Sequence, residues 1–472
     1  MAPTASSTPR LSRWGLRLLI VLGVIYLIAL GALGLKEANP DFGQVPDNPI
    51  VAQTPANFLF GAATSAHQIE GGNTHNDWAA FEADPSLIRD GQPSGAATDH
   101  WNRVSEDVRL LGDLGANAYR FSIEWSRVEP VEGQWDEAAW AHYADEIAQL
   151  KAADIDLMVT LLHFTLPRWL AERGGLTATD FPERFTRLAS EAASRFGSEV
   201  RLWCTVNEPN VQMYQGYVQG VWPPGISDTS QAATAFAGLL RGHATAAAAI
   251  RAADSDAHVG AAVNLIVFDP SRRWFLLDWI AAREADKGFN WAFYDSIQAG
   301  RITFNLAGFP EIDEELPGLA GSADFFGLNY YRRNLVRFSP KAPGLVTLLQ
   351  GPGPLSDSGV EIYPEGLLRL IRRVWSRYEL PIFITENGVS DSDGDLRPDF
   401  LRGHLHAVMQ AITEDIPVEG YFHWSLLDNY EWSEGYGPRF GLYAVDFETF
   451  ERKPGAATQE FSRLAGLLAN HD

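Results

Sequence analysis

The sequence predicts a closed (β/α)8 barrel, a TIM barrel, that follows an N-terminal hydrophobic helix. From residue 57 onward, eight short apolar runs alternate with longer and often helical stretches. Strictly alternating β and α units form a parallel sheet, and eight of them suggest closure into a barrel. No glycine-rich phosphate loop follows a predicted strand, which weakens the alternative of an open doubly wound sheet. Before residue 57 stands one long apolar segment.

That segment, LLIVLGVIYLIALGALGL at residues 18–35, holds 18 uninterrupted apolar or small residues. As a helix it would rise about 27 Å, close to the hydrocarbon thickness of a bilayer. Three arginines lie in residues 1–17, whereas only Lys36 directly follows the segment. This asymmetry places the N-terminus in the cytoplasm. We therefore expect residues 1–17 to be a cytoplasmic basic tail and residues 18–35 a single-pass transmembrane anchor.

A cleaved signal peptide is the alternative for this segment, because Ala32 and Gly34 could form a cleavage site. The catalytic domain would then be secreted, whereas with an anchor it stays at the membrane outside the cytoplasm. Residues 36–56 are rich in Pro, Asn and Asp and are predicted to be a tether. Residues 57–469 are predicted to form the barrel domain.

The strands are expected in chain order, each followed by a longer connection. The eight runs are FLFGAATSA (58–66), AYRFSIEW (118–125), DLMVTLLHF (156–164), RLWCTVNEP (201–209), HVGAAVNLIVF (258–268), DFFGLNYY (324–331), PIFITENGV (381–389) and VEGYFHWSLL (418–427). Helical patterns follow the first four runs, around 104–115, 138–153, 182–196 and 234–253.

Composition excludes several classes of function. The formal net charge of −23 argues against nucleic acid and anionic surfaces as partners. The single cysteine, Cys204, excludes an intrachain disulfide and a cysteine-rich metal site. It lies in the apolar run LWCTV and is expected to be buried.

Two glutamates stand where predicted strands end. Glu386 follows the buried run IFIT, and Glu208 stands in TVNEP at the end of the fourth strand. The carboxyl ends of barrel strands carry the active site. Two carboxylates across one barrel mouth suit acid/base and nucleophilic chemistry on a glycosidic bond. The alternative is that each is a solvated loop glutamate. Pro209 should hold Glu208 in an extended conformation.

Six motifs then occur in one order along the chain: FLFGAATSAHQIEGG, YRFSIEWSRVEP, TVNEP, GLNYY, ITENG and WSLLDNYEWSEGY. In this order, across residues 57 to about 460, they resemble the family 1 glycoside hydrolases, the β-glucosidase and β-galactosidase group. The resemblance implies a retaining β-glycosidase that hydrolyses β-D-glucosides or related β-glycosides by double displacement. Glu386 would be the nucleophile that forms a covalent glycosyl-enzyme, and Glu208 the acid/base.

The same resemblance implies the rest of the site. Arg120, Asn329 and Tyr331 would support the nucleophile, although Arg120 could instead form a structural ion pair with Glu124 or another barrel carboxylate. The substrate-binding residues would be Gln68, His163, Asn207, Tyr331, Trp424, Glu431 and Trp432. Glu434 would join Glu431 near the 6-position of the sugar. No cofactor and no metal is expected, because no His/Asp/Glu set at the strand ends has ligand-like spacing.

Other features concern the leaving group. Val360 stands where many family members carry a tryptophan that lines the aglycone side. The variant HFTLP at residues 163–167, where the family usually has HWDLP, the ending GYGPRFGLYAVD and the N-terminal segment are similar to the membrane-attached galactolipid-remodelling branch. The alternatives are therefore a transglycosylase that remodels glycolipids with the same residues, and a non-catalytic carbohydrate-binding protein. The latter class commonly lacks a catalytic carboxylate, and here both are present.

Overall fold

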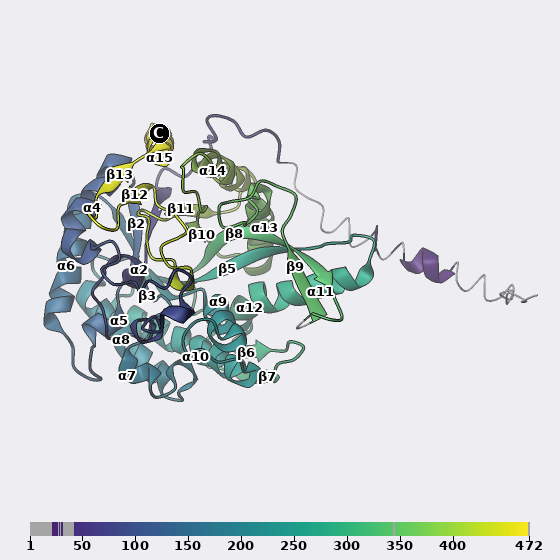
Figure 1. Ribbon diagram of the computed structural model, residues 1–472, viewed down its shortest axis with the longest axis horizontal. Coiled ribbons are helices and arrows are strands. Elements are labelled where there is room, and N and C mark those ends of the chain that lie inside the picture. Colours follow the sequence, from purple (N-terminus) through teal and green to yellow (C-terminus); the bar gives the residue numbers. More distant parts are fainter. Residues whose placement is uncertain (1–20, 27, 29, 32–41, 343–344, 471–472) are drawn as a thin grey trace, which may run out of the picture.

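Eight parallel strands close into a barrel in the computed structural model, which describes residues 21–26, 28, 30–31, 42–342 and 345–470 (Figure 1). Each strand pairs in parallel with its neighbours, and the pairing of β10 with β8 completes the ring. The barrel strands are β1 (Leu59–Ala63), β2 (Ala118–Ser122), β3 (Asp156–Leu162), β4 (Leu202–Asn207), β5 (His258–Pro270), β8 (Phe325–Phe338), β10 (Ile382–Asn387) and β11 (Val418–Trp424). All eight predicted strands are confirmed.

Helices surround the barrel. The longer ones are α4 (His100–Leu114), α6 (Glu137–Ala152), α8 (Phe181–Phe196), α10 (Thr229–Ala253), α11 (Leu276–Asp286), α12 (Ala292–Ala299), α13 (Pro364–Tyr378), α14 (Arg397–Thr413) and α15 (Ala456–Ala469). Capping fixes where some of them begin: Asp136 accepts from two backbone N–H groups of α6, and Asp228 from two of α10. The four predicted helices match α4, α6, α8 and α10 closely.

Short elements fill the connections. They are α2 (Ala66–Ile69), α3 (Asp77–Phe81), α5 (Trp125–Val128), α7 (Arg168–Ala171), α9 (Pro209–Met213), the 3-10 helices η1 (Pro85–Leu87), η2 (Gly175–Thr177) and η6 (Trp432–Glu434), the π-helices η3 (Tyr214–Gln219) and η4 (Lys287–Trp291), and the strands β6 (Arg301–Phe304), β7 (Ile312–Glu315), β9 (Val346–Leu349), β12 (Tyr443–Val445) and β13 (Arg452–Pro454).

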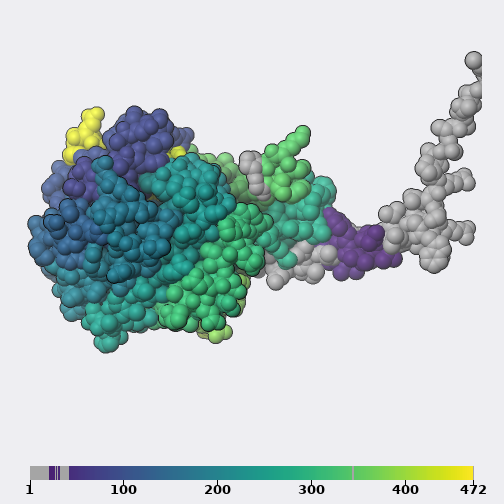
Figure 2. Space-filling view, turned by 90° about the horizontal axis from the view of Figure 1, so that it is seen from below, coloured from purple at the N-terminus to yellow at the C-terminus, as the bar shows by residue number. Residues whose placement is uncertain are grey.

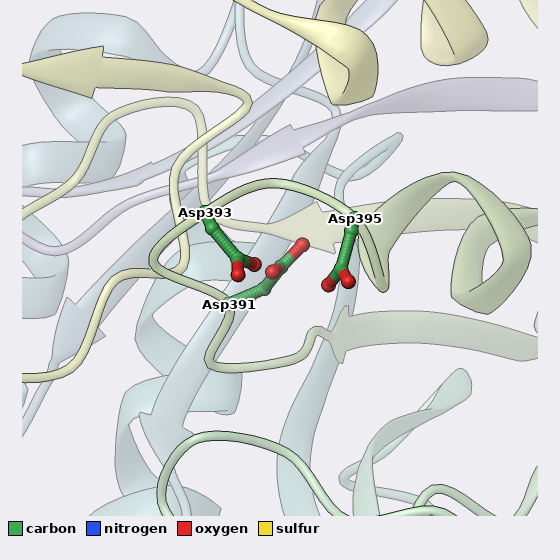
Figure 3. A group of neighbouring side chains, drawn as sticks. All are labelled: Asp391, Asp393 and Asp395. Carbon is green, nitrogen blue, oxygen red and sulfur yellow. The ribbon is translucent and has the colours of Figure 1, made fainter.

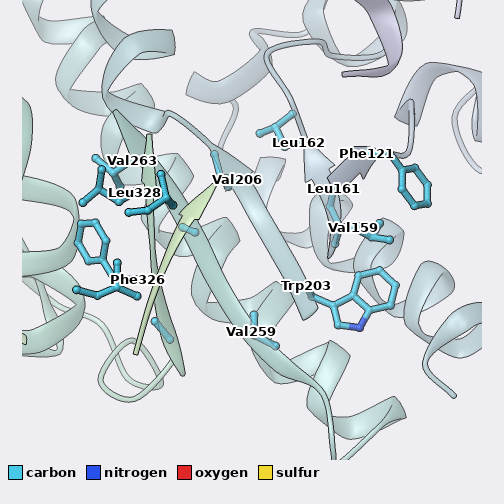
Figure 4. Packing of buried hydrophobic residues seen from close by; sticks show 14 of the residues in the cluster. Phe121, Val159, Leu161, Leu162, Trp203, Val206, Val259, Val263, Phe326 and Leu328 are labelled. Carbon is cyan, nitrogen blue, oxygen red and sulfur yellow. The ribbon is translucent and has the colours of Figure 1, made fainter. Parts of the chain in front are cut away.

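Alternation along the strands separates two cores. In β2, Tyr119 and Phe121 belong to the large cluster between strands and helices, part of which Figure 4 shows. Ala118 belongs to a second cluster with Met158 and Cys204, inside the barrel. Side chains two residues apart share a face of a strand, so Arg120 lies inside the barrel directly above this apolar layer. The burial predicted for Cys204 is confirmed.

Two strands continue beyond the barrel. β5 and β8 remain paired past Leu265 and Tyr330, through to the pair Pro270 and Val336. β9 then pairs with β8 in the antiparallel direction. Asp278 of α11 binds both the Arg272 guanidinium and the backbone N–H of Phe338, at 2.7 and 2.9 Å, and so ties α11 to this extension. The predicted strands ended earlier, at residues 268 and 331.

The N-terminal predictions are only partly covered by the described residues. Residues 21–26, 28 and 30–31 are helical. The predicted tail, residues 1–17, lies outside the described residues, as do residues 18–20, 27, 29 and 32–35 of the predicted anchor. Within the described ranges, no helix combines the length and apolar character needed to cross a bilayer.

Of the predicted tether, residues 42–56 are described. Phe42 is buried, and its carbonyl oxygen accepts from two residues of α14, His406 Nε2 at 3.0 Å and Gln410 Nε2 at 3.1 Å. The buried side chain and the carbonyl oxygen of Phe42 therefore attach this part of the chain to α14. Residues 36–41 lie outside the described residues.

Candidate active site

Both glutamates lie at the carboxyl edge of the barrel. Glu386 is part of β10, and Glu208 directly follows β4. Both residues are buried: Glu386 is 3% exposed and Glu208 is 6% exposed. Glu208 is not extended as predicted, since its φ of 45° and ψ of 57° are left-handed. Pro209 disfavours the right-handed helical region for the residue before it, which leaves the left-handed region accessible. Such a backbone costs about 1–3 kcal/mol and is typical of functional sites.

Glu386 is surrounded by groups that favour its ionised form. Arg120 Nη1 donates to Oε1 at 2.6 Å, and the Tyr331 hydroxyl donates to Oε2 at 2.8 Å. Burial raises the pKa of Glu386, and Arg120 and then Tyr331 oppose this effect. Because a guanidinium balances its charge, Glu386 is the carboxyl group suited to act as an anion.

Arg120 connects four strands of the barrel. Its fully buried guanidinium donates to Thr160 Oγ1 on β3, to Asn207 Oδ1 on β4 and to the Thr385 carbonyl on β10, at 3.1, 2.7 and 3.1 Å. Its ion pair is with Glu386. The alternative pairing with Glu124 is therefore wrong.

Glu208 has a different environment. Its Oε1 accepts from Asn264 Nδ2 and Asn329 Nδ2, both at 2.8 Å, and within the described residues it makes no ion pair. Burial and then the charge of Glu386 raise the pKa of Glu208 to about 8, while the two amide donors oppose the rise. At neutral pH this carboxyl group therefore holds a proton that it can donate.

Asn264 was missed from the sequence. It stands in β5 inside the apolar run HVGAAVNLIVF, where an isolated amide was the available signal. Its partner could not be read from the sequence, because the pairing of β4 with β5 shifts register between Cys204 and Asn207.

A chain of amide contacts links Arg120, the ion-pair partner of Glu386, to a histidine. Asn207 Oδ1 accepts from Arg120 and from Asn329, so its Nδ2 is the donor toward His163 Nε2 at 3.1 Å. The neutral ring then carries its proton on Nδ1, which is buried and has no hydrogen-bond partner in the described structure. Burial and then Arg120 lower the pKa of His163 well below its usual value. A neutral donor without a partner is available to a ligand.

Aromatic rings and one carboxyl group close the other side of the site. His163 stacks on Trp424 and Trp432, with ring centroids 5.8 and 6.1 Å apart. Trp424 Nε1 donates to Glu431 Oε1 at 3.2 Å, and burial raises the pKa of Glu431 to about 8. Gln68 Nε2 donates to the Tyr430 carbonyl at 2.8 Å, which holds Gln68 beside this loop. Planar rings with nearby amide and carboxyl groups suit a sugar, which offers both an apolar face and hydroxyl groups.

Glu434 does not join this group. Its side chain is 52% exposed and pairs with Arg89 at 2.7 Å on the surface. The expectation that Glu434 lies near the sugar is therefore wrong. The 3-10 helix η6 turns it away from Glu431.

Three aspartates gather in the loop after β10 (Figure 3). Ligand oxygens of Asp391, Asp393 and Asp395 lie within 4.8 Å of one another. Asp391 is buried, and its carboxylate accepts from the backbone N–H groups of Gly394 and Arg397 at 3.0 and 2.9 Å. Its contacts explain it as a cap for the start of α14, so we assign it a structural role.

Comparison with known proteins agrees with this geometry. The sequence model described as "Glycosyl hydrolase family 1" matches residues 51–466. β-Glucosidase A of Thermotoga maritima is 35% identical over 425 residues, which cover 85% of this chain and 95% of that protein. A solved β-glycosidase from Pyrococcus horikoshii superposes with a TM-score of 0.80 at 37% identity, over 87% of this chain and 94% of that one. The T. maritima β-glucosidase in complex with glucoimidazole gives 0.83 at 32% identity, over 89% and 99%.

Proposed function

The chain belongs to glycosyl hydrolase family 1 and is a retaining β-glycosidase, and from this we propose that it hydrolyses β-D-glucosides through a covalent intermediate on Glu386. One observation carries the proposal: two buried glutamates have opposite surroundings. Glu386 is hydrogen-bonded to a guanidinium and a phenol, whereas the hydrogen-bond donors to the Glu208 carboxyl group in the described part of the chain are two neutral amides. One is suited to attack and the other to donate a proton.

In the first step, Glu386 attacks the anomeric carbon while Glu208 gives its proton to the leaving glycosidic oxygen. The bond to the leaving group breaks, and an ester between the sugar and Glu386 forms. Esterification removes the negative charge of Glu386, which is one cause of the raised pKa of Glu208. The pKa of Glu208 then falls toward its ordinary range.

In the second step, ionised Glu208 takes a proton from water, and the water oxygen attacks the anomeric carbon. Glu386 leaves as a carboxylate that Arg120 and Tyr331 receive, and the sugar is released with its original β configuration. His163 Nδ1, Asn207, Gln68 and Glu431 would bind sugar hydroxyl groups, with Trp424 and Trp432 beside the ring.

Azide and the configuration of its products test the two roles. Glu386→Gly should abolish turnover, and azide entering the vacated face should yield the α-glycosyl azide. Glu208→Ala should hydrolyse activated aryl glycosides far better than alkyl glycosides, since the former need little protonation. There azide should yield the β-glycosyl azide.

Glu434→Ala is the matched control, because this exposed glutamate follows the same strand as Glu431 yet lies outside the site. It should retain wild-type kcat/KM. Equal losses for Glu386→Gly and Glu208→Ala on every substrate, with no azide product from either, would show that the roles are wrongly assigned.

We also propose that residues 18–35 hold the enzyme at a membrane with the barrel outside the cytoplasm, as the apolar length and the preceding arginines support. At that location a glycolipid hydroxyl could replace water in the second step, so transglycosylation is the second candidate. Fractionation of cells with external protease tests the location, and product analysis with a glycolipid acceptor tests the transfer. Soluble protein beginning near residue 35 would favour a cleaved signal.

A further inference from the structure

The paired extension of β5 and β8 stands above the mouth of the barrel. β10 ends at Asn387, opposite Tyr330, whereas β8 continues for eight residues to Phe338. At 3.3 Å per residue these eight residues span roughly 26 Å. Parallel strands leave the barrel at the edge that carries Glu208 and Glu386, so the extension projects from the face with the active site (Figure 1).

This extension carries an exposed apolar surface, which we call the apolar platform. It consists of three α11-side residues at intervals of three, Trp274, Leu277 and Ile280, and two residues of the β8–β9 hairpin, Leu345 and Leu348. Their exposed fractions are 66, 40, 49, 53 and 47%. Leu277 and Ile280 lie three apart on α11 and so share a face of this helix, and Trp274 stands in the turn directly before it. Apolar side chains grouped in this way mark a contact surface rather than scattered exceptions.

The described N-terminal helical residues lie against the same extension. The Tyr26 hydroxyl donates to the Trp274 carbonyl at 2.6 Å and accepts from the Leu276 N–H at 3.2 Å. Figure 2 shows the purple N-terminal residues beside the teal and green atoms of the extension. Of the fifteen exposed large apolar side chains in the described residues, ten lie on these two parts; the N-terminal ones are Val21, Leu22, Val24, Ile25 and Ile28.

The charge of this region is opposite to that of the whole chain. Residues 271–280 and 332–356, which span the platform, contain six basic residues and one acidic residue, Asp278, in a chain of net charge −23. Arg273, Arg337 and Lys341 are exposed, and none of them forms an ion pair in the part of the chain that the structure describes. At physiological salt, charges beyond about 8 Å are largely screened. These three cations therefore dominate the electrostatic potential at the platform, where the nearby exposed acidic residue of α11 is Glu284, one turn after Ile280.

We propose that the apolar platform and its three cations dock onto an anionic lipid bilayer beside the N-terminal helix. Leu and Trp side chains next to Arg and Lys are the composition of interfacial membrane contacts. A second copy of the chain fits less well, because a symmetric contact would bring the same cations together. Docking holds the barrel mouth toward the headgroups. The consequence that lipid-borne β-glycosides are favoured substrates rests on the proposed function; the docking itself does not.

Flotation with vesicles tests the docking without the N-terminal segment. The protein used is residues 42–472, which fold as a unit because solved relatives consist almost wholly of this barrel. It should float with phosphatidylcholine vesicles that contain phosphatidylglycerol. Trp274→Ser/Leu277→Ser/Leu348→Ser should lower the partition coefficient at least ~10-fold, since apolar burial drives interfacial binding. The matched control, Leu87→Ser/Val131→Ser, replaces exposed apolar residues elsewhere and should float like the wild type.

The charge contribution has its own control. Arg273→Glu/Lys341→Glu should lose binding to phosphatidylglycerol vesicles, whereas Lys151→Glu/Arg201→Glu, at the opposite end of the barrel, should not. Failure of the wild type to float, or equal behaviour of platform and control variants, would overturn the docking. So would a dimer in sedimentation that only the platform variant dissociates, since that would make a second copy the occupant.

Activity of the full chain in nanodiscs separates the two proposals. The platform variant should lower kcat/KM for a β-glucosyl lipid in the same disc about fivefold or more, and leave that for soluble p-nitrophenyl β-glucoside unchanged. A wild type inactive on both substrates that still floats would contradict the proposed function alone. If the ratio of kcat/KM for the β-glucosyl lipid to that for the soluble glucoside were equal in the wild type and the platform variant, the proposal that docking holds the barrel mouth toward the headgroups would be refuted.

Discussion

Replacement of Asn264 by alanine should move the alkaline limb of activity to higher pH. Asn264 Nδ2 donates to Glu208 Oε1 at 2.8 Å and favours the ionised form of Glu208. Its removal disfavours that form, so the pKa of Glu208 rises. A hydrogen bond to a charged group contributes about 1.5–3 kcal/mol, and 1.36 kcal/mol corresponds to one pKa unit, so the rise should be about 1–2 units.

The direction of the effect follows from the acid role. Glu208 must be protonated to assist the leaving group, and activity is lost as pH rises through its pKa of about 8. In Asn264→Ala the midpoint of this loss should lie at about pH 9–10. The Asn329 donor to the same oxygen remains in this variant, so Glu208 keeps one of its two amide partners.

The assay is kcat/KM for an alkyl β-glucoside between pH 5 and 10, because kcat/KM reports the free enzyme. Circular dichroism at each pH separates titration from unfolding. Asn102→Ala is the matched control, since this exposed asparagine binds only Asp99 on the surface. An alkaline limb that stays in place, or that moves to lower pH, would refute the link between Asn264 and the acid.

Two further outcomes are expected. Tyr331→Phe removes the 2.8 Å hydrogen bond to Glu386, so the pKa of Glu386 should rise and the acidic limb of kcat/KM should move up by about 1–2 units; an unmoved limb would contradict this. His100 is buried, which alone would lower its pKa, but Asp107 and Glu146 raise the pKa to about 10. The stability from these contacts is complete below pH ~6.5 and is lost as pH rises through about 10. Thermal unfolding should show this loss in the wild type and a flatter profile in His100→Asn, and parallel profiles would exclude the linkage.

The barrel strands could be predicted from the sequence because they are short apolar runs bounded by polar loops. The run predicted at 381–389 corresponds to β10, Ile382–Asn387. The Asn387–Gly388 pair does not form a hairpin turn, because the next strand in the chain, β11, pairs with β10 in the parallel direction. Gly388 is needed because a Cβ there would lie 2.0 Å from the Trp424 carbonyl oxygen. That contact joins residues far apart in the chain, which local patterns do not reveal.

Other features depend on three-dimensional packing and were missed. The strand β8 continues through RRNLVRF, whose arginines concealed it. Arg333 there pairs at 2.6 Å with Glu361, which stands in the connection between β9 and α13. Glu434 was predicted to lie near the sugar because it stands three residues after Glu431 in the same motif. The 3-10 helix η6 lies between the two residues, and Glu434 is on the surface. The roles of Glu208 and Glu386 came from the family resemblance, while their opposite environments come from tertiary contacts.

Because Arg120 bonds to β3, β4 and β10, substitutions at this position should lower the abundance of the folded protein as well as its activity. The guanidinium that balances the nucleophile also holds three strands beside its own. Removing one partner of a buried ion pair leaves an uncompensated charge and costs about 3–5 kcal/mol. In a mutational scan, position 120 would therefore be depleted by low abundance before its kinetics could be scored. Neutral substitutions of Glu386 would leave the Arg120 guanidinium uncompensated in the same way but keep its bonds to β3, β4 and β10, so they should lower abundance less than substitutions of Arg120 do.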